Sequence, residues 1–305
     1  MNVVFMGTPD FAVGCLEMLN KKYNVVGVFT QPDKPKGRKY VLTPPPVKEK
    51  ALELGLNVYQ PTTLRDGEAY NLLKELNPDL IVVVAYGKIL PKELLELPKY
   101  KCINVHASLL PRHRGASPIQ WCIVCGDDIT GVTTMLMDEG MDTGDILLSS
   151  ETVIDKDETS ETLHDRLALM GTTLLDKTIE GILDGTVKPI KQNDNEATYA
   201  PIIKKEMALI DFSLSAKQIV DAIRGYNPWP CAYFTLSGKR IKVYKAEALS
   251  TTGEVGTIID SNNRLVIGCE EGSVSLIEVQ PEGSKRMSIT DMLRGRPVEI
   301  GTKII

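Results

Sequence analysis

The sequence predicts an α/β protein. Its N-terminal domain is expected to be a Rossmann-like, doubly wound, mostly parallel sheet, and its C-terminal domain a small OB-like β-barrel. In the N-terminal part, short apolar runs alternate with stretches of helical periodicity, as in consecutive βαβ units. After residue 206, short runs of alternating apolar and polar residues are separated by Gly, Asn and Ser turns, which is typical of a small barrel.

The N-terminal elements follow one another in a regular order. The unbroken apolar run from Leu80 to Ala85 indicates a parallel strand buried on both faces. Consecutive parallel strands need right-handed crossovers between them, which the intervening helices supply. Helices are predicted over 11–19, 47–54 and 70–76, and further strands over 3–6, 25–29, 58–59 and 102–105.

The turn after the first strand argues against a dinucleotide cofactor. It reads Gly7-Thr8-Pro9-Asp10 and lacks the G-x-G-x-x-G spacing that lets a backbone approach a pyrophosphate. A nicotinamide-dependent dehydrogenase therefore ranks last among the functions considered. Ligands of doubly wound sheets lie beyond the carboxyl ends of the strands, so the residues after Ala85 and Val105 are the first candidates for a site.

A polar stretch from Gln192 to Glu196 indicates where the two domains are joined. We expect a catalytic domain over 1–189, a linker over 190–206 and a β-barrel domain over 207–305. The apolar runs of this last domain cover 232–236, 240–246, 256–259, 264–268 and 273–279.

Composition limits the class of protein. Hydrophobic residues make up 43% of the chain and charged residues 25%, which is ordinary for a globular protein. No signal peptide is recognisable, and no apolar run approaches the ~18–20 residues that span a bilayer. We therefore expect a cytoplasmic protein without a membrane partner. Separately from composition, the working hypothesis is a monomer.

Two polar residues stand at the end of the strand predicted over 102–105. Asn104 and His106 are two positions apart, so on a strand they point to the same face. Histidine suits proton transfer near neutral pH, and an asparagine amide can donate a hydrogen bond to a developing oxyanion. Further along, Gly140 and Gly144 bracket Asp142 in a loop. Each residue alone is more often structural, but together Asn104, His106 and Asp142 predict a catalytic trio for acyl-type transfer.

The motifs around this trio are more specific than the trio itself. The chain reads N-x-H-x-S-L-L-P-R-x-R-G over Asn104 to Gly115, T-G-V-T over Thr130 to Thr133, and D-x-G-x-D-T-G-D over Asp138 to Asp145. This combination resembles the folate-dependent formyltransferases. The resemblance implies that the matching Asn104, His106 and Asp142 are the catalytic set and that the donor is a reduced folate, 10-formyltetrahydrofolate.

The resemblance also implies a folate site and a reaction without a metal or a covalent enzyme intermediate. The S-L-L-P segment contacts the folate in this family, and the residues after the strand from Leu80 form part of the pterin wall. The folate-binding candidates are Ser108, Leu109, Leu110, Pro111, Tyr86 and Gly87.

Three further segments indicate the acceptor. The basic insertion from Thr30 to Lys39 resembles a family loop that wedges against the acceptor end of a tRNA, with Arg38 at the position of the loop arginine. Asn227 to Pro230 matches an N-P-W-P signature of the C-terminal domain, and Gln280 to Ser288 resembles Q-P-x-G-K-x-x-M-S. They favour the family branch that formylates the α-amine of initiator methionyl-tRNA for translation initiation.

Basic residues are expected to hold the tRNA by its phosphates, which positions a nucleic acid without reading its sequence. The net charge is −5, yet residues 207–305 carry 12 Lys and Arg against 11 Asp and Glu. The candidates are Arg38, Lys39, Lys204, Lys205, Lys217, Lys239, Arg240, Lys242, Lys245, Lys285 and Arg286.

Two other functions remain open at this point. The same catalytic domain could formylate the amine of a nucleotide-sugar, against which the basic insertion and the C-terminal lysines count. A non-catalytic RNA-binding module is the other alternative, and the intact trio argues against it.

Overall fold

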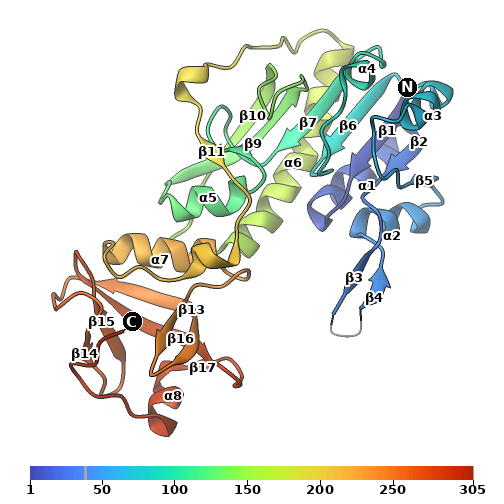
Figure 1. Ribbon diagram of the computed structural model, residues 1–305. Helices are drawn as coiled ribbons and strands as arrows, with labels where there is room; N and C mark the ends of the chain where they lie inside the picture. The colour runs from blue at the N-terminus through green and yellow to red at the C-terminus, as the bar shows by residue number, and fades with distance from the viewer. Residues whose placement is uncertain (38–39, 305) are drawn as a thin grey trace. The chain divides into compact units, whose positions relative to one another are not determined.

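The computed structural model describes residues 1–37 and 40–304, and the chain forms two compact units that interleave along the sequence (Figure 1). The predicted domain boundaries at 189 and 206 stay a prediction. The first unit comprises Met1–Gly115, Thr130–Thr152 and His164–Tyr199; the second comprises Ala116–Ile129, Val153–Leu163 and the chain from Ala200 onward.

A seven-stranded sheet forms the centre of the first unit, in the order β10-β9-β7-β6-β1-β2-β5. The pairs β1–β2, β1–β6, β6–β7 and β2–β5 are parallel, and β7–β9 is antiparallel. The predicted mostly parallel sheet is therefore confirmed. Its strands are β1 (Asn2–Gly7), β2 (Asn24–Phe29), β5 (Val58–Tyr59), β6 (Leu80–Val84), β7 (Cys102–His106), β9 (Ile129–Leu136) and β10 (Ile146–Val153).

Helices cover both faces of this sheet, as expected for a doubly wound fold. On one face, Val4 of β1 belongs to a buried cluster with Leu73 of α3 and Leu94 of α4. On the other, a Cβ added to Gly171 of α6 would lie 3.0 Å from the side chain of Val105, so this helix approaches β7 closely. The helices of this part are α1 (Val13–Lys22), α2 (Pro46–Glu53), α3 (Glu68–Leu76), α4 (Lys92–Leu95) and α6 (Ser160–Leu183).

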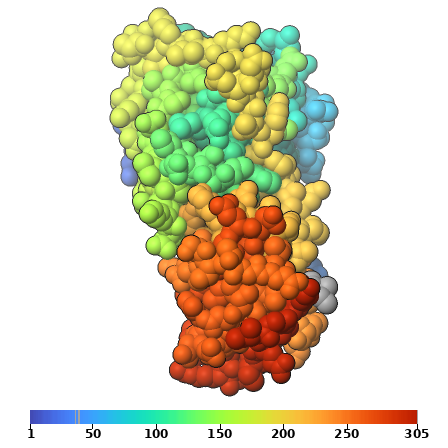
Figure 2. All heavy atoms as spheres, turned by 90° about the vertical axis from the view of Figure 1, so that its left-hand side faces the viewer, coloured from blue at the N-terminus to red at the C-terminus, as the bar shows by residue number. Residues whose placement is uncertain are grey.

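The second unit contains the predicted C-terminal all-β domain, an antiparallel sheet in the order β12-β13-β16-β15-β14, with β17 beside β16. The closely packed body drawn in orange and red in Figure 2 has a core that includes Phe234, Val243 and Ile267. Its strands are β12 (Tyr233–Leu236), β13 (Lys239–Leu249), β14 (Ile258–Asp260), β15 (Leu265–Gly268), β16 (Ser273–Pro281) and β17 (Met287–Ser288).

Three helices belong to the second unit: α5 (Pro118–Val124), α7 (Ala216–Gly225) and α8 (Ile289–Gly295). None of the three falls in the ranges 11–19, 47–54 and 70–76 over which helices are predicted. In α7, the Ser215 hydroxyl accepts from the Gln218 N–H, and the Gln218 side chain accepts from the Ser215 N–H. Such a capping box satisfies two helix-end donors, so α7 begins directly after Ser215.

Two local differences from the sequence prediction have clear causes. The helix predicted from residue 11 begins at Val13, because Asp10–Ala12 forms a tighter 3-10 turn in which the Asp10 carboxylate accepts from the Phe11 N–H. The basic insertion forms a hairpin of β3 (Lys34–Lys36) and β4 (Val41–Thr43), while the predicted tRNA contacts Arg38 and Lys39 lie outside the described residues.

Among the helices of residues 1–37 and 40–304, none is both long and apolar enough to cross a membrane.

Candidate active site

Strand β7 places Asn104 and His106 on one face at its carboxyl end. Asn104 is paired with Met135 of β9, and His106 with Thr133. The His106 side chain is only 6% exposed, whereas Asn104 is half-buried. The edge of a parallel sheet thus presents a buried imidazole beside an amide, as the spacing in the sequence predicts.

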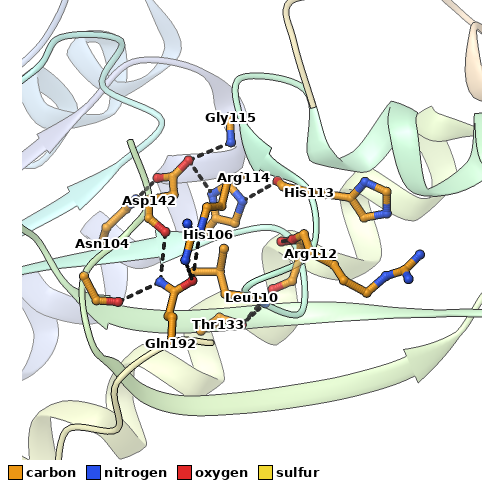
Figure 3. A network of polar contacts seen from close by, with 12 residues as sticks. Asn104, His106, Leu110, Arg112, His113, Arg114, Gly115, Thr133, Asp142 and Gln192 are labelled. Atoms are coloured by element: carbon orange, nitrogen blue, oxygen red, sulfur yellow. Dashed lines mark hydrogen bonds and ion pairs between the residues drawn. The ribbon is translucent and has the colours of Figure 1, made fainter. Parts of the chain in front are cut away.

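The Asp142 carboxylate lies between these two side chains (Figure 3). Its Oδ1 accepts a 3.3 Å hydrogen bond from Asn104 Nδ2, and its Oδ2 lies 3.6 Å from His106 Nδ1. Oδ2 also accepts a 2.8 Å bond from the Gly115 N–H. The structure therefore brings the three predicted catalytic residues together, although Asp142 comes from a distant loop.

His106 is oriented by main chain on its other side. Its Nε2 lies 3.0 Å from the His113 carbonyl oxygen. A carbonyl can only accept, so Nε2 carries the hydrogen and Nδ1 is directed toward Asp142. His113 itself has a left-handed backbone with φ 56° and donates its N–H to the Thr198 hydroxyl at 2.8 Å. His113 therefore serves through its backbone, which fits a structural role.

Several residues of the glycine-rich D-x-G-x-D-T-G-D motif fix the shape of the Asp142 loop. The Asp138 carboxylate accepts from the Gly140 N–H at 3.0 Å and from the Thr143 hydroxyl at 2.7 Å, which closes the loop on itself. A Cβ added to Gly144 would lie 1.7 Å from the Leu136 carbonyl oxygen. Asp142 has a left-handed φ of 55°, a conformation that non-glycine residues rarely adopt. The loop is compact and directs the carboxylate inward.

The S-L-L-P segment is fastened to the sheet by Thr133, the last residue of the T-G-V-T motif. The Thr133 hydroxyl donates to the Ser108 carbonyl at 2.7 Å and accepts from the Leu110 N–H at 3.2 Å. The Ser108 hydroxyl donates to the Arg112 carbonyl at 2.6 Å. Hydrogen bonds between the T-G-V-T and S-L-L-P motifs thus fix the backbone next to the trio.

Tyr86 and Gly87 are held by polar side chains from two other loops. The Thr8 hydroxyl and the Gln31 amide both donate to the Tyr86 carbonyl at 3.1 Å, and the same amide reaches the Gly87 carbonyl at 3.3 Å. The Tyr86 ring is buried, and burial raises the pKa of its hydroxyl to about 12. This hydroxyl has no hydrogen-bond partner among the described residues.

A cavity of about 670 Å³ follows this segment in the first unit. One wall is the stretch from Ile89 to Leu94, and Glu139 of the Asp142 loop contributes to another. The lining carries the cations Arg65 and Lys92 and the carboxylates Glu93 and Glu139, and Lys92 lies 3.8 Å from Glu139. The sequence places this wall just after Tyr86 and Gly87, but the lining includes neither of them and no residue of the trio.

Sequence reasoning missed two buried members of this network, Arg114 and Gln192. Arg114 stands inside the R-x-R-G motif without an assigned role, and Gln192 falls in the polar stretch predicted to be a linker. The Gln192 amide nevertheless donates to the carbonyls of Asp142 and Gly144 at 2.8 and 2.7 Å. A polar residue in a polar stretch carries no local signal of burial, so only the fold reveals it.

The predicted tRNA contacts that the structure describes are spread over the second unit, and they are exposed or half-buried. Three of them already have an acidic partner: Lys217 pairs with Asp221, Lys245 with Asp157 and Arg286 with Glu278. The others form no ion pair with any residue that the structure describes; they are Lys204, Lys205, Lys239, Arg240, Lys242 and Lys285.

The fold and the trio define a group-transfer enzyme with a doubly wound catalytic part and a C-terminal β domain. The family model of the formyl transferases matches residues 1–179, and that of the formyl transferase C-terminal domain matches residues 202–297. The chain therefore belongs to the formyl transferase family, which confirms the resemblance predicted from the motifs.

Similar proteins cover nearly the whole chain. A methionyl-tRNA formyltransferase of Caldanaerobacter subterraneus subsp. tengcongensis is 48% identical over 306 residues, covering 99% of each chain. One of Clostridium novyi is 49% identical over 304 residues, covering 98% of each. A crystal structure of a sugar 3N-formyl transferase, solved with dTDP and 5-N-formyl-THF, is 19% identical with a TM-score of 0.69, covering 93% of this chain and 99% of that one. At that identity the likeness concerns the fold.

Proposed function

We propose that the chain transfers the formyl group of 10-formyltetrahydrofolate to the α-amine of initiator methionyl-tRNA. The observation that best supports formyl transfer is the position of the Asp142 carboxylate between Asn104 and His106. The acceptor is supported by the methionyl-tRNA formyltransferases that match this chain over nearly its full length.

The trio suits attack of an amine on a formyl carbon. An α-amine has a pKa of about 7.7–8.0 in solution, so a useful fraction is neutral at pH 7. Its attack forms a C–N bond and a tetrahedral oxyanion, which the second Nδ2 hydrogen of Asn104 is placed to stabilise by hydrogen bonding, while His106 lies beside it with Nδ1 toward Asp142. The bond between the formyl carbon and N10 of the folate then breaks, and a proton passes from the amine to N10. His106 and Asp142 are the titratable groups beside this path.

The folate is proposed to lie along Tyr86, Gly87 and the segment from Ser108 to Pro111. The adjoining cavity of about 670 Å³ is large enough for part of such a ligand. Arg65 and Lys92 would face its glutamate carboxylates. Because the Ser108 hydroxyl is engaged by the Arg112 carbonyl, the segment would contact folate through its backbone and apolar side chains.

The outer face of β12, β13 and β16 is the proposed tRNA surface. The Arg240 guanidinium lies 4.3 Å above the Tyr233 ring, and that of Arg286 lies 4.2 Å above Tyr244. Arg240 and Lys242 also line a groove of about 520 Å³ in this sheet. Exposed cations beside aromatic rings suit contacts with phosphates and bases. Lys204, Lys205, Lys239 and Lys285 are proposed to add phosphate contacts elsewhere on the C-terminal part.

The same proposal sets the cellular context. A charged initiator tRNA is a cytoplasmic substrate, so the enzyme is proposed to act there. We further propose that the enzyme acts as a monomer. Analytical ultracentrifugation of the purified protein measures its oligomeric state.

Formyl transfer to defined acceptors tests the proposal. Wild-type protein would be given 10-formyltetrahydrofolate with methionyl-initiator tRNA, with the same tRNA uncharged, or with a dTDP-amino sugar. We expect N-formylmethionyl-tRNA from the first acceptor alone. Formylation of the amino sugar with no reaction on the charged tRNA would reassign the acceptor, and no transfer to any amine would overturn the proposal.

A further inference from the structure

Gln192 is buried beside the trio, and its side-chain amide is fully engaged. Nε2 donates to the Asp142 carbonyl at 2.8 Å and to the Gly144 carbonyl at 2.7 Å. Oε1 accepts from Arg114 Nε at 3.0 Å and from Arg114 Nη2 at 2.8 Å. A primary amide offers two donor hydrogens and two lone pairs, so this side chain has no hydrogen-bonding capacity left over.

The two carbonyls held by Gln192 belong to the part of the loop that most needs support. Asp142 has a left-handed φ of 55°, and Gly144 is so close to the Leu136 carbonyl that no Cβ fits there. Sparsely populated backbone conformations persist where the surrounding structure over-determines them. Gln192 supplies such hydrogen bonds on both sides of Thr143 (Figure 3).

Arg114 determines which end of the amide faces the loop. Its side chain is 2% exposed, and its guanidinium has only donors, so it must meet the oxygen of Gln192. The nitrogen is thereby directed at the carbonyls of Asp142 and Gly144. The same Nη2 also donates to the exposed carboxylate of Asp194 at 2.8 Å. The order of interactions is therefore Arg114, Gln192, loop backbone and Asp142 carboxylate.

We infer that Gln192, oriented by Arg114, is a positioning residue for formyl transfer, which rests on the function proposed above. By fixing the backbone of Asp142, it keeps one carboxylate oxygen on Asn104 and the other on His106. It touches neither side chain itself and acts only through the loop.

Two substitutions separate this role from simple stabilisation. Gln192→Glu keeps an acceptor for Arg114, and adds a charge-assisted bond to it, but cannot donate to the two carbonyls. Gln192→Met is similar in size and removes both sets of hydrogen bonds. Asn195→Asp is the matched control, because it makes the same amide-to-carboxylate change on an exposed side chain nearby.

The experiment measures single-turnover formylation, the KM for charged tRNA and thermal unfolding of the full chain. We expect the rate of Gln192→Glu to fall about 100-fold, since a displacement near 1 Å costs about that much. Its melting temperature should stay near that of wild type and its KM should not change. Gln192→Met should lose rate and melting temperature together. If Gln192→Glu fails to fold, Gln192→Asn carries the comparison, since it keeps the amide but is one methylene shorter.

A second readout does not depend on the acceptor. The chain has 3 histidines, so ¹⁵N-histidine labelling gives few ring signals. The ring nitrogens of His106 should shift in Gln192→Glu, whereas those of His164 should not. A folded Gln192→Glu with wild-type rate and unshifted His106 signals would overturn the inference. Absence of formylation by wild-type protein would instead refute the proposed function. The ¹⁵N shifts of His106 would then still test whether Gln192 positions the Asp142 loop.

Discussion

The catalytic network of the first unit and the outer face of the C-terminal sheet use polar groups in opposite ways. Around Asp142, the proposed catalytic side chains are buried or half-buried, and they bond to one another and to the backbone. On the outer face of β13, the side chains of Arg240 and Lys242 form no ion pair with any residue that the structure describes. Buried, satisfied groups are fixed before the substrate arrives, which serves chemistry. Exposed cations stay adaptable and act through a salt-dependent attraction.

Removing a donor from the buried network gives the largest expected effect. Asn104→Ala should lower kcat for formyl transfer by about 10²–10³-fold, because one oxyanion donor is worth that much. Initial-rate assays with saturating charged tRNA and folate would measure this kcat. Asn263→Ala, which changes an exposed asparagine of the C-terminal part, is the control. A wild-type kcat for folded Asn104→Ala would mean that the amide does not meet the oxyanion.

The Asp142 loop should also tolerate no added side chain. Gly144→Ala would place a Cβ 1.7 Å from the Leu136 carbonyl, so we expect a loss of about 3 kcal/mol in the free energy of unfolding. Gly295→Ala, at the end of α8 with nothing within 4 Å, should change it by less than about 0.5 kcal/mol. Urea titrations would compare the two, and equal stability of both variants would contradict the loop geometry.

On the C-terminal face, the expected effect is on tRNA affinity. Arg240→Ala combined with Lys242→Ala should raise the KM for charged tRNA. It should also reduce the slope of log affinity against log salt by about 1 for each phosphate that the variant no longer neutralises. Arg264→Ala removes a cation that is already paired with Asp260 at 2.7 Å and serves as the control. An unchanged salt slope in the double variant would place the tRNA surface elsewhere.

The smallest expected effect concerns the buried, unpartnered hydroxyl of Tyr86. Tyr86→Phe should raise the free energy of unfolding by about 1 kcal/mol at neutral pH, because an unsatisfied buried hydroxyl is costly. Burial raises the pKa of Tyr86 from 10.0 to about 12. This hydroxyl therefore adds no pH dependence below pH 10, and it lowers the free energy of unfolding as the pH rises from 10 toward 12. The alkaline decline should be shallower in Tyr86→Phe; an identical decline would show that this phenol does not titrate there.

The contrast between the two regions also explains what the sequence could predict. Asn104 and His106 share a face because of strand geometry alone, and the glycines around Asp142 mark a loop. The hydrogen bonds between Arg114 and Gln192 join residues 78 positions apart, and no local pattern encodes them. Helix α7 begins at a capping box of Ser215 and Gln218, a local signal that the sequence contains but that the predicted helices leave out.

The surface residues are harder to predict for a different reason. A lysine in an exposed loop has the same local pattern whether it meets a phosphate or an acid. Lys217 and Lys245 were equal candidates in the sequence, yet both have carboxylate partners, at 2.8 and 3.2 Å. Only the fold separates them from Arg240 and Lys242.

The most direct test of the central claim is the rate of formyl transfer by Asp142→Asn. The substitution keeps the size of the side chain and an oxygen for the Gly115 N–H, but removes the charge between Asn104 and His106. We predict a fall of at least about 100-fold in the single-turnover rate, with melting temperature and tRNA affinity unchanged. A folded Asp142→Asn that formylates charged tRNA at the wild-type rate would contradict the account.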